Sequence, residues 1–296
     1  MSLSLVKGTI ILTIFGLGIL GNIFIFLNYV HMFKENKKKF IYLLYTHLAF
    51  TNTIMLLLKG TPKILAAFGV ENFLKDIGCM IFVYLERVTR GLSICTTCLL
   101  TLVQAITISP RDSAWRKLKL QSVRHILSPL LFFWILNSSI SINLLYYIKN
   151  VRSMNISQTS QCDGYCCFLP GNLIMRWIFL ALMVLRDAVF QGIMAVASGY
   201  MEFHLHKHHQ RVLYLQRSKF AYKTPPEVKA AQCVLFLMLC FLFFYWAECV
   251  LSLLINSFLE NNFMMVNIQE YVRFGYEILS PFILIPKDKN LAQWWH

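Results

Sequence analysis

Three charged residues lie close together in the otherwise apolar stretch "YLERVTRGLSICTTCLLTLVQAITISP", which runs from Tyr84 to Pro110. They are Glu86, Arg87 and Arg90. On a helix, Glu86 and Arg90 share one face because they are four residues apart, while Arg87 points elsewhere. A charge inside a membrane is costly unless it is paired or wetted. The three residues therefore form either an internal Glu86–Arg90 salt bridge or, as we favour, part of the polar wall of a ligand cavity.

Further charges interrupt the other apolar stretches of the chain. Asp187 and Arg273 are the ones we expect to complete the wall of this cavity. We also expect Asp187 to pair with an Arg of another helix, and Arg273 can pair with Glu277, four residues further on. Cavity-lining and buried-pair roles are equally consistent with the sequence for these and for Lys59, Lys63, Arg186 and Glu248. If Lys59 and Lys63 lie near the outer end of their span, snorkelling to the membrane surface is the commoner explanation for them.

The composition of the chain is that of a membrane protein. Of its 296 residues 57% are hydrophobic and only 14% are charged, against about 25% charged residues in a typical soluble domain. The formal charge is +14, but the basic residues stand in short clusters between long apolar runs. They lack the solvated basic face with aromatic platforms that nucleic-acid binding needs, so nucleic acid is not an expected partner.

Seven apolar stretches are each long enough to cross the lipid bilayer as a helix. The sequence thus predicts an all-α protein, a seven-transmembrane helix bundle forming a single domain over residues 1–296. The predicted spans are residues 5–30, 41–67, 77–109, 125–148, 172–203, 230–259 and 268–286.

The positions of Lys and Arg predict how the chain is oriented. The loops after the first, third and fifth spans and the C-terminal tail together hold 17 of them, and the opposite loops and N-terminus hold four. Because basic loops stay in the cytoplasm, the N-terminus is expected outside the cell and the C-terminus in the cytoplasm. We therefore expect a multi-pass protein of the plasma membrane.

Cysteines and a glycosylation sequon mark the predicted second outer loop. Cys79 lies at the outer mouth of the third span, and the loop itself contains Cys162, Cys166 and Cys167. A disulfide between Cys79 and one loop cysteine is favoured because that side is oxidising, but spacing alone leaves the connectivity open. Asn155-Ile156-Ser157 is a glycosylation sequon in the same loop, whereas the sequon at Asn137 falls inside a span and is expected to be buried.

Several other functions are disfavoured by what the spans contain. The seventh span has no Lys to form a Schiff base with retinal, and the histidines within the spans are too few and too far apart to build a hydrolytic metal centre. His204 and His208 have a chelating spacing but no obvious third ligand, so a basic helical extension is favoured over zinc. We expect no enzyme activity, cofactor or metal. A transporter or channel remains the alternative, although internal repeats are not visible.

The stretch "RVTRGLSICTTCLLTLVQAITISP" closely resembles the third span of the vomeronasal type-1 receptors, a class A-like group of G-protein-coupled receptors. The resemblance continues in "THLAFTN", "LKGTPKILAAFG", "ASGYMEFHLHKHHQRVLYLQR" and "SPFIL", and so covers nearly the whole chain. It implies a receptor for pheromones or small odorants that signals through a heterotrimeric G protein of the inhibitory (Gi/Go) class. In place of the His that family members usually have before the Arg-Val pair, this chain has Glu86.

The resemblance also implies roles for particular residues. It favours Cys166 as the partner of Cys79, and it places Glu86, seven residues after Cys79, at the depth where related receptors hold the charge partner of a ligand. A carboxylate there would favour a cationic or hydrogen-bond-donating ligand. Because the usual acidic-Arg pair at the inner end of the third span is missing, we expect the G protein to bind near Gln104, Arg111 and Arg211.

Overall fold

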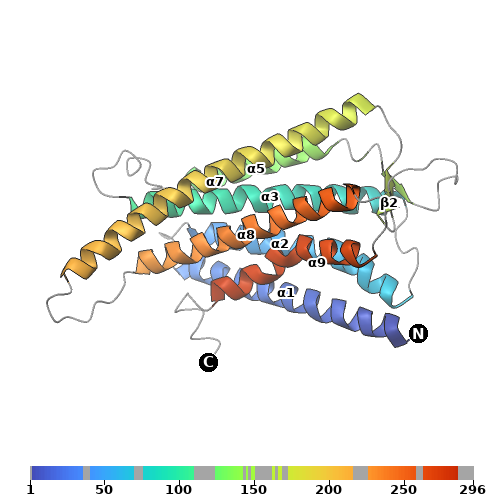
Figure 1. Cartoon of the computed structure of the whole chain (residues 1–296), viewed down its shortest axis with the longest axis horizontal. Helices are drawn as coiled ribbons and strands as arrows, with labels where there is room; N and C mark the ends of the chain where they lie inside the picture. The colour runs from blue at the N-terminus through green and yellow to red at the C-terminus, as the bar shows by residue number, and fades with distance from the viewer. Residues whose placement is uncertain are drawn as a thin grey trace.

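The computed structural model shows a bundle of long helices lying side by side (Figure 1). The described residues are 2–35, 41–69, 76–109, 124–142, 145, 148–150, 162–163, 166–168, 173–215, 226–257 and 263–285. Within them seven helices form the bundle, which confirms the predicted all-α fold class. These helices are α1 (Ser2–Glu35), α2 (Ile41–Ala67), α3 (Asp76–Ile108), α5 (Arg124–Ser141), α7 (Leu173–Leu215), α8 (Pro226–Ser257) and α9 (Phe263–Leu284).

Most of these helices are suited to a membrane by length and composition alone. Five of them, α1, α2, α3, α7 and α8, contain stretches long and apolar enough to cross one. Helix α5 offers a shorter apolar stretch, His125–Ser141. Helix α9 carries three charged residues, Glu270, Arg273 and Glu277, along its 22 residues. These charges lower the apolarity of α9. Because a charged side chain within a span is energetically unfavourable, they are candidates for a functional role.

Two helices differ in length from their predicted spans. Helix α5 ends at Ser141, whereas the sequence predicted a span to residue 148. The apolar run of the sequence continues past Ser141 to Ile148, where a short strand begins, so apolarity alone does not mark the end of this helix. Helix α7 continues to Leu215, past the predicted end at residue 203, and its C-terminal part extends beyond its neighbours (Figure 1). The stretch "HLHKHHQR" that follows residue 203 is polar, so the continuous apolar pattern stops before the helix does.

A small antiparallel sheet lies at the end of the bundle where the chain begins (Figure 1). Its strands are β1 (Ile148–Asn150), β2 (Cys162–Asp163) and β3 (Cys166–Phe168), in the order β1-β3-β2. Strand β1 packs against α3, on which Cys79 is fully buried and disulfide-bonded. Cys79 therefore forms a disulfide, while a loop cysteine as its partner, and Cys166 in particular, stay predictions.

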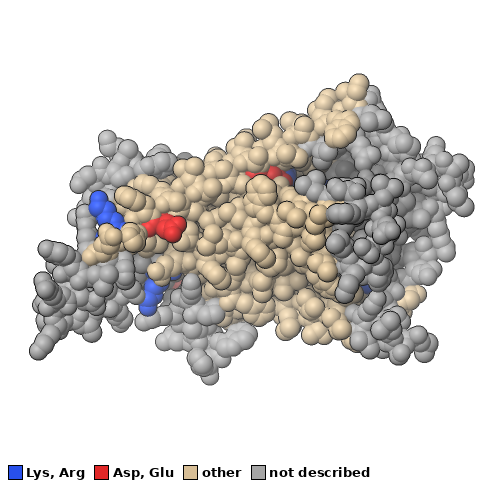
Figure 2. All heavy atoms as spheres, in the orientation of Figure 1, with Lys and Arg blue, Asp and Glu red and all other residues tan. Residues whose placement is uncertain are grey.

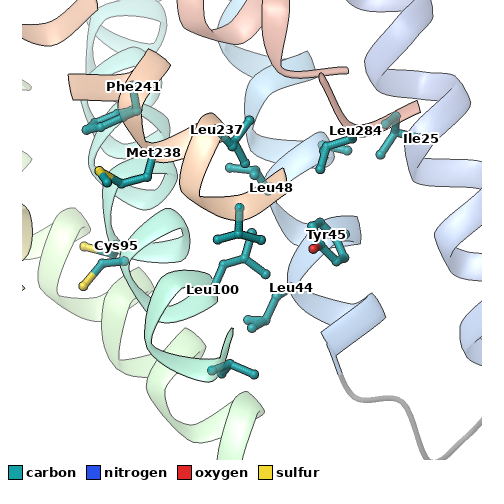
Figure 3. Close-up of a cluster of buried hydrophobic side chains, with 14 of the residues drawn as sticks. Ile25, Leu44, Tyr45, Leu48, Cys95, Leu100, Leu237, Met238, Phe241 and Leu284 are labelled. Atoms are coloured by element: carbon teal, nitrogen blue, oxygen red, sulfur yellow. The ribbon is translucent and has the colours of Figure 1, made fainter. Parts of the chain in front are cut away.

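The main hydrophobic core joins several helices. Leu44 and Leu48 of α2 meet Leu100 of α3, Leu237 of α8 and Leu284 of α9, and each is at most 5% exposed (Figure 3). The outward faces are also apolar, and the visible middle of the bundle shows few charges (Figure 2). Burial therefore does not separate apolar from polar residues as it does in water. Apolar side chains on the outward faces suit contact with lipid. The buried polar groups are therefore the residues that indicate where a functional site lies.

Candidate functional site

Glu248 of α8 accepts hydrogen bonds from two arginines on two other helices. Arg90 of α3 donates from Nη1 to Glu248 Oε1 at 3.0 Å and from Nη2 to Oε2. Arg273 of α9 donates from Nε to the same Oε1 at 2.9 Å. A single carboxylate therefore ties α3, α8 and α9 together. Contacts in which both partners are charged are roughly twice as strong as neutral hydrogen bonds, and the fork of the guanidinium fixes their direction.

This Arg90–Glu248–Arg273 cluster is not fully enclosed. The side chains of Arg90 and Arg273 keep 22% and 25% of their surface exposed, against 12% for Glu248. The guanidinium carbon of Arg90 also lies 5.9 Å from the ring centre of Tyr245, within cation–π range. Both arginines thus retain surface and unused N–H donors that another group could contact.

Glu86 is paired with a different residue from the one the sequence suggested. Lys59 Nζ of α2 lies 2.9 Å from Glu86 Oε1, and both side chains are largely buried. The alternative of an internal Glu86–Arg90 pair is therefore not the one that forms, and the cavity-lining role that we favoured stays a prediction. Although the two residues share a helix face, each has an oppositely charged side chain on a neighbouring helix, and these contacts across the bundle replace the one along α3.

Asp187 belongs to a second cluster, in which Arg186 is the central donor. Arg186 Nη2 lies 2.6 Å from Asp187 Oδ1, and Nη1 donates to Asn137 Oδ1 of α5 at 2.7 Å. Tyr245 of α8 donates from its hydroxyl to Asp187 Oδ2 at 3.3 Å. The expectation that Asp187 pairs with an Arg of another helix was wrong, because the adjacent Arg186 folds back onto it. Tyr245 places this second cluster beside Arg90.

Gly91 is needed where α3 approaches this second cluster. A Cβ atom added to Gly91 would lie 2.7 Å from Asn137 Cγ and would overlap Asn137 Oδ1 and Arg186 Nη1. Asn137 is fully buried, as expected for a sequon inside a span, so it has little room to move. The hydrogen bond between Asn137 and Arg186 therefore depends on the absence of a side chain at position 91.

Two buried charged groups lack a hydrogen-bond partner within the described part of the chain. They are Nε of Arg87 and Oε2 of Glu277. Glu277 was a candidate partner for Arg273, but Arg273 binds Glu248 instead, so that pairing was also wrong. Unsatisfied buried polar atoms are uncommon because leaving one unpaired costs about 1–3 kcal/mol. Arg87 thus has donor capacity close to the Arg90–Glu248–Arg273 cluster.

Neutral hydrogen bonds join the helices on the side of these clusters nearer to the C-terminal ends of α3 and α9. Asn52 of α2 donates to Ser280 of α9 and accepts from Ser93 of α3, both at 3.0 Å. The Thr97 and Tyr276 hydroxyl oxygens are also 3.0 Å apart. These short, neutral links hold α2, α3 and α9 in register and leave the arginines concentrated in one layer.

The remaining predicted residues are only partly covered by the structure. Gln104 is buried at 3% exposure, and Arg211 lies on α7. Arg111 and Asn155 lie outside the described residues. No group of His, Cys, Asp and Glu among the described residues is arranged to hold a metal, and His204 packs on the ring of Tyr200. The G-protein surface and the glycan therefore stay predictions.

The structure brings Arg90 and Arg273 together and leaves Glu86 in a separate pair. Glu248 connects the two arginines, although in the sequence it stood out no more than other charges within the spans. Asn137 and Tyr245 were not candidates for the site. The sequence signals for these three residues were a lone carboxylate and two polar groups inside apolar stretches, and such signals do not identify which helices face each other.

A helix bundle with charged side chains in its interior is the architecture of a membrane receptor or transporter, and comparison with known proteins decides between the two. The chain matches the family described as "Vomeronasal organ pheromone receptor family" over residues 6–296. It is 32% identical over 275 residues to human "Vomeronasal type-1 receptor 4", covering 93% of this chain and 91% of that protein. It is 34% identical over 282 residues to "Vomeronasal type-1 receptor 90" of Rattus norvegicus, covering 94% and 89%.

A relative outside mammals shows how far the similarity extends. The chain is 28% identical over 289 residues to "Olfactory receptor class A-like protein 1" of Danio rerio, covering 97% of this chain and 90% of that protein. The chain belongs to the vomeronasal type-1 receptor family. It is accordingly a multi-pass chemosensory receptor of the cell membrane, with a small-molecule ligand and a G protein as partners, and not an enzyme.

Proposed function

We propose that the receptor detects a pheromone or related small odorant that binds within the bundle, next to the Arg90–Glu248–Arg273 cluster. The observation that supports this most is that two partly exposed arginines share one carboxylate in the interior of a membrane protein. The proposed ligand site comprises Arg87, Arg90 and Arg273, with Glu86 and Asp187 bordering it through their own ion pairs.

The charges around the site favour a ligand that accepts hydrogen bonds or carries a negative charge. Basic side chains exceed acidic ones among the described side chains of this layer. The basic residues are Lys59, Lys63, Arg87, Arg90, Arg186 and Arg273, and the acidic ones are Glu86, Asp187, Glu248 and Glu277. The cationic ligand suggested by Glu86 alone loses its support, because Lys59 already neutralises that carboxylate.

Signalling through an inhibitory-class (Gi/Go) G protein completes the proposal. With the N-terminus outside, the basic loops and the polar end of α7 face the cytoplasm, where they attract both anionic lipid and the G protein. The contact region then includes Gln104, Arg111 and Arg211. Since Gln104 is buried in this structure, α3 and its neighbours must separate at that end before the G protein can contact it.

Expression of the receptor in cultured cells together with a Gi/Go protein tests the function. We expect a calcium or cyclic-nucleotide response to some members of a panel of urinary and skin compounds, and we expect pertussis toxin to abolish it. The panel should pair each carboxylic acid with its methyl ester and with an amine of the same skeleton. Ionic currents or tracer flux in the absence of a G protein would contradict this proposal.

Arg87→Gln tests the site itself. Loss of one hydrogen bond to a charged group costs about 1.5–3 kcal/mol, so half-maximal activation by the best acid should need about ten- to a hundredfold more ligand. The same substitution should change the response to the matched ester much less. Glu35→Gln, in an exposed pair with His31, serves as control. Equal losses for acid and ester, at normal surface expression, would contradict a direct contact between Arg87 and the ligand.

A further inference from the structure

We infer that Glu248 is a latch that holds α8 against α3 and α9, and that a ligand activates the receptor by taking Arg90 and Arg273 away from it. This inference rests on the proposed function and adds how that site is regulated. It assigns to Glu248 a role in controlling the basal state as well as the preference for ligands.

The strongest polar contacts between α8 and its neighbouring helices come from one turn of α8. Glu248 contacts both arginines, and Tyr245, one turn earlier on the same face, contacts Asp187 of α7. A further side-chain hydrogen bond from α8 runs from the Cys233 thiol to the Ile283 carbonyl at 3.5 Å, toward the opposite end of the helix. A thiol is a weak donor. Polar forces on the described part of α8 therefore act mainly through the turn that contains Tyr245 and Glu248.

The contacts of Glu248 are also ones that a ligand can replace. A guanidinium has five N–H donors, and Glu248 uses two of Arg90 and one of Arg273. An acceptor group of the ligand that approaches their exposed sides competes with Glu248 for the same positive charge. A ligand can shift a conformational equilibrium only through different affinities for the two states. The ligand competes with Glu248 only while Glu248 is bound to the two arginines. Its affinity is therefore higher for the state in which these contacts are broken.

Neutralising Glu248 should therefore imitate part of the action of the ligand. Coupling between two sites is typically about five- to 150-fold, so ligand-independent signalling of Glu248→Gln should rise about fivefold or more per receptor at the surface. The potency of the acid compound should also increase in this variant, because the competing carboxylate is gone. A residue that only stabilises the fold would lower expression and would raise neither quantity.

The test compares wild type, Glu248→Gln, Glu248→Asp and the double variant Glu248→Gln/Arg273→Gln, with Glu35→Gln as the matched exposed control. Basal and ligand-driven Gi/Go activation are measured and divided by surface receptor. Glu248→Asp keeps the charge on a shorter side chain and should give an intermediate basal rise. Glu248→Gln leaves both Arg90 and Arg273 without their carboxylate, and the double variant removes one of these two cations. Its basal signalling therefore reports on the latch even if Glu248→Gln alone folds poorly.

The outcomes separate the two proposals. If wild type activates no G protein with any compound of the panel, the proposed function fails. If wild type responds but all Glu248 variants at the surface keep wild-type basal signalling, the latch is refuted and the receptor function stands. Raised basal signalling with lowered potency for the acid would also overturn it, because Glu248 would then bind the ligand and not compete with it.

Discussion

Gly91→Ala should destabilise the receptor far more than a single methyl group normally does in an exposed part of a helix. The added Cβ would lie 2.7 Å from Asn137 Cγ and overlap the ends of Asn137 and Arg186 that hydrogen-bond each other at 2.7 Å. Either the two side chains separate or α3 shifts away from α5. The first outcome breaks the hydrogen bond between α5 and α7, and the second loosens the packing of α3 against α5.

The size of the effect follows from two terms. Overpacking of a well-filled core typically costs about 1–3 kcal/mol. Loss of a hydrogen bond to a charged group costs about 1.5–3 kcal/mol. Because the two terms share the same atoms they do not add fully, and we expect a loss of about 2–4 kcal/mol in the free energy of unfolding.

Buried cysteines provide the assay. Cys95 and Cys98 are free and at most 2% exposed, so a thiol-reactive dye labels them when the bundle opens. A thermal ramp of purified receptor in detergent with this dye should show a lower midpoint for Gly91→Ala. Gly192→Ala on α7 is the control, because no atom outside its own stretch of helix backbone lies within 4 Å of the position that its Cβ would take. Gly91→Ala/Asn137→Ala should recover part of the loss. A midpoint for Gly91→Ala equal to that of wild type would refute the close packing described at Gly91.

Two further predictions concern pairs of residues near the same end of the bundle. Glu86→Gln should reduce surface expression, measured by surface labelling, because it leaves the charge of Lys59 without its partner. The double variant Glu86→Gln/Lys59→Met should restore expression better than Glu86→Gln/Arg90→Met. The opposite order would favour an internal Glu86–Arg90 pair. Cys79 should be joined to Cys166, and this bridge should contribute about 2–4 kcal/mol of stability. Peptide mapping under non-reducing conditions that joins Cys79 to Cys162 or Cys167 would contradict the assignment.

Among the described residues, the number, order and approximate positions of the bundle helices are those that the sequence predicted. A chain in a membrane must satisfy its backbone hydrogen bonds internally, so an apolar stretch of sufficient length has few alternatives to a helix. The ends of the helices were predicted less accurately. Apolarity reports where lipid lies, and it neither stops at Ser141 with α5 nor continues to Leu215 with α7.

The sequence also identified most of the charges in the site, because a charge in an apolar stretch is conspicuous. Arg90 and Arg273 were predicted to lie in one site, and the structure brings them together on Glu248. The ion pairs that the sequence offered as alternatives are not the ones that form. Spacing along one helix suggested Glu86 with Arg90, whereas the structure pairs Glu86 with Lys59 of another helix.

What the sequence determined by itself is therefore the membrane bundle, the family and the presence of charges that need a reason. The tertiary structure decided which charges meet. Residues 90, 248 and 273 are separated by long stretches of chain, and only the rotation and packing of α3, α8 and α9 bring their side chains within 3.0 Å. Periodicity fixes the face of a helix on which a residue lies, but the neighbour of that face is set by side-chain packing between helices, including the close approach that Gly91 allows.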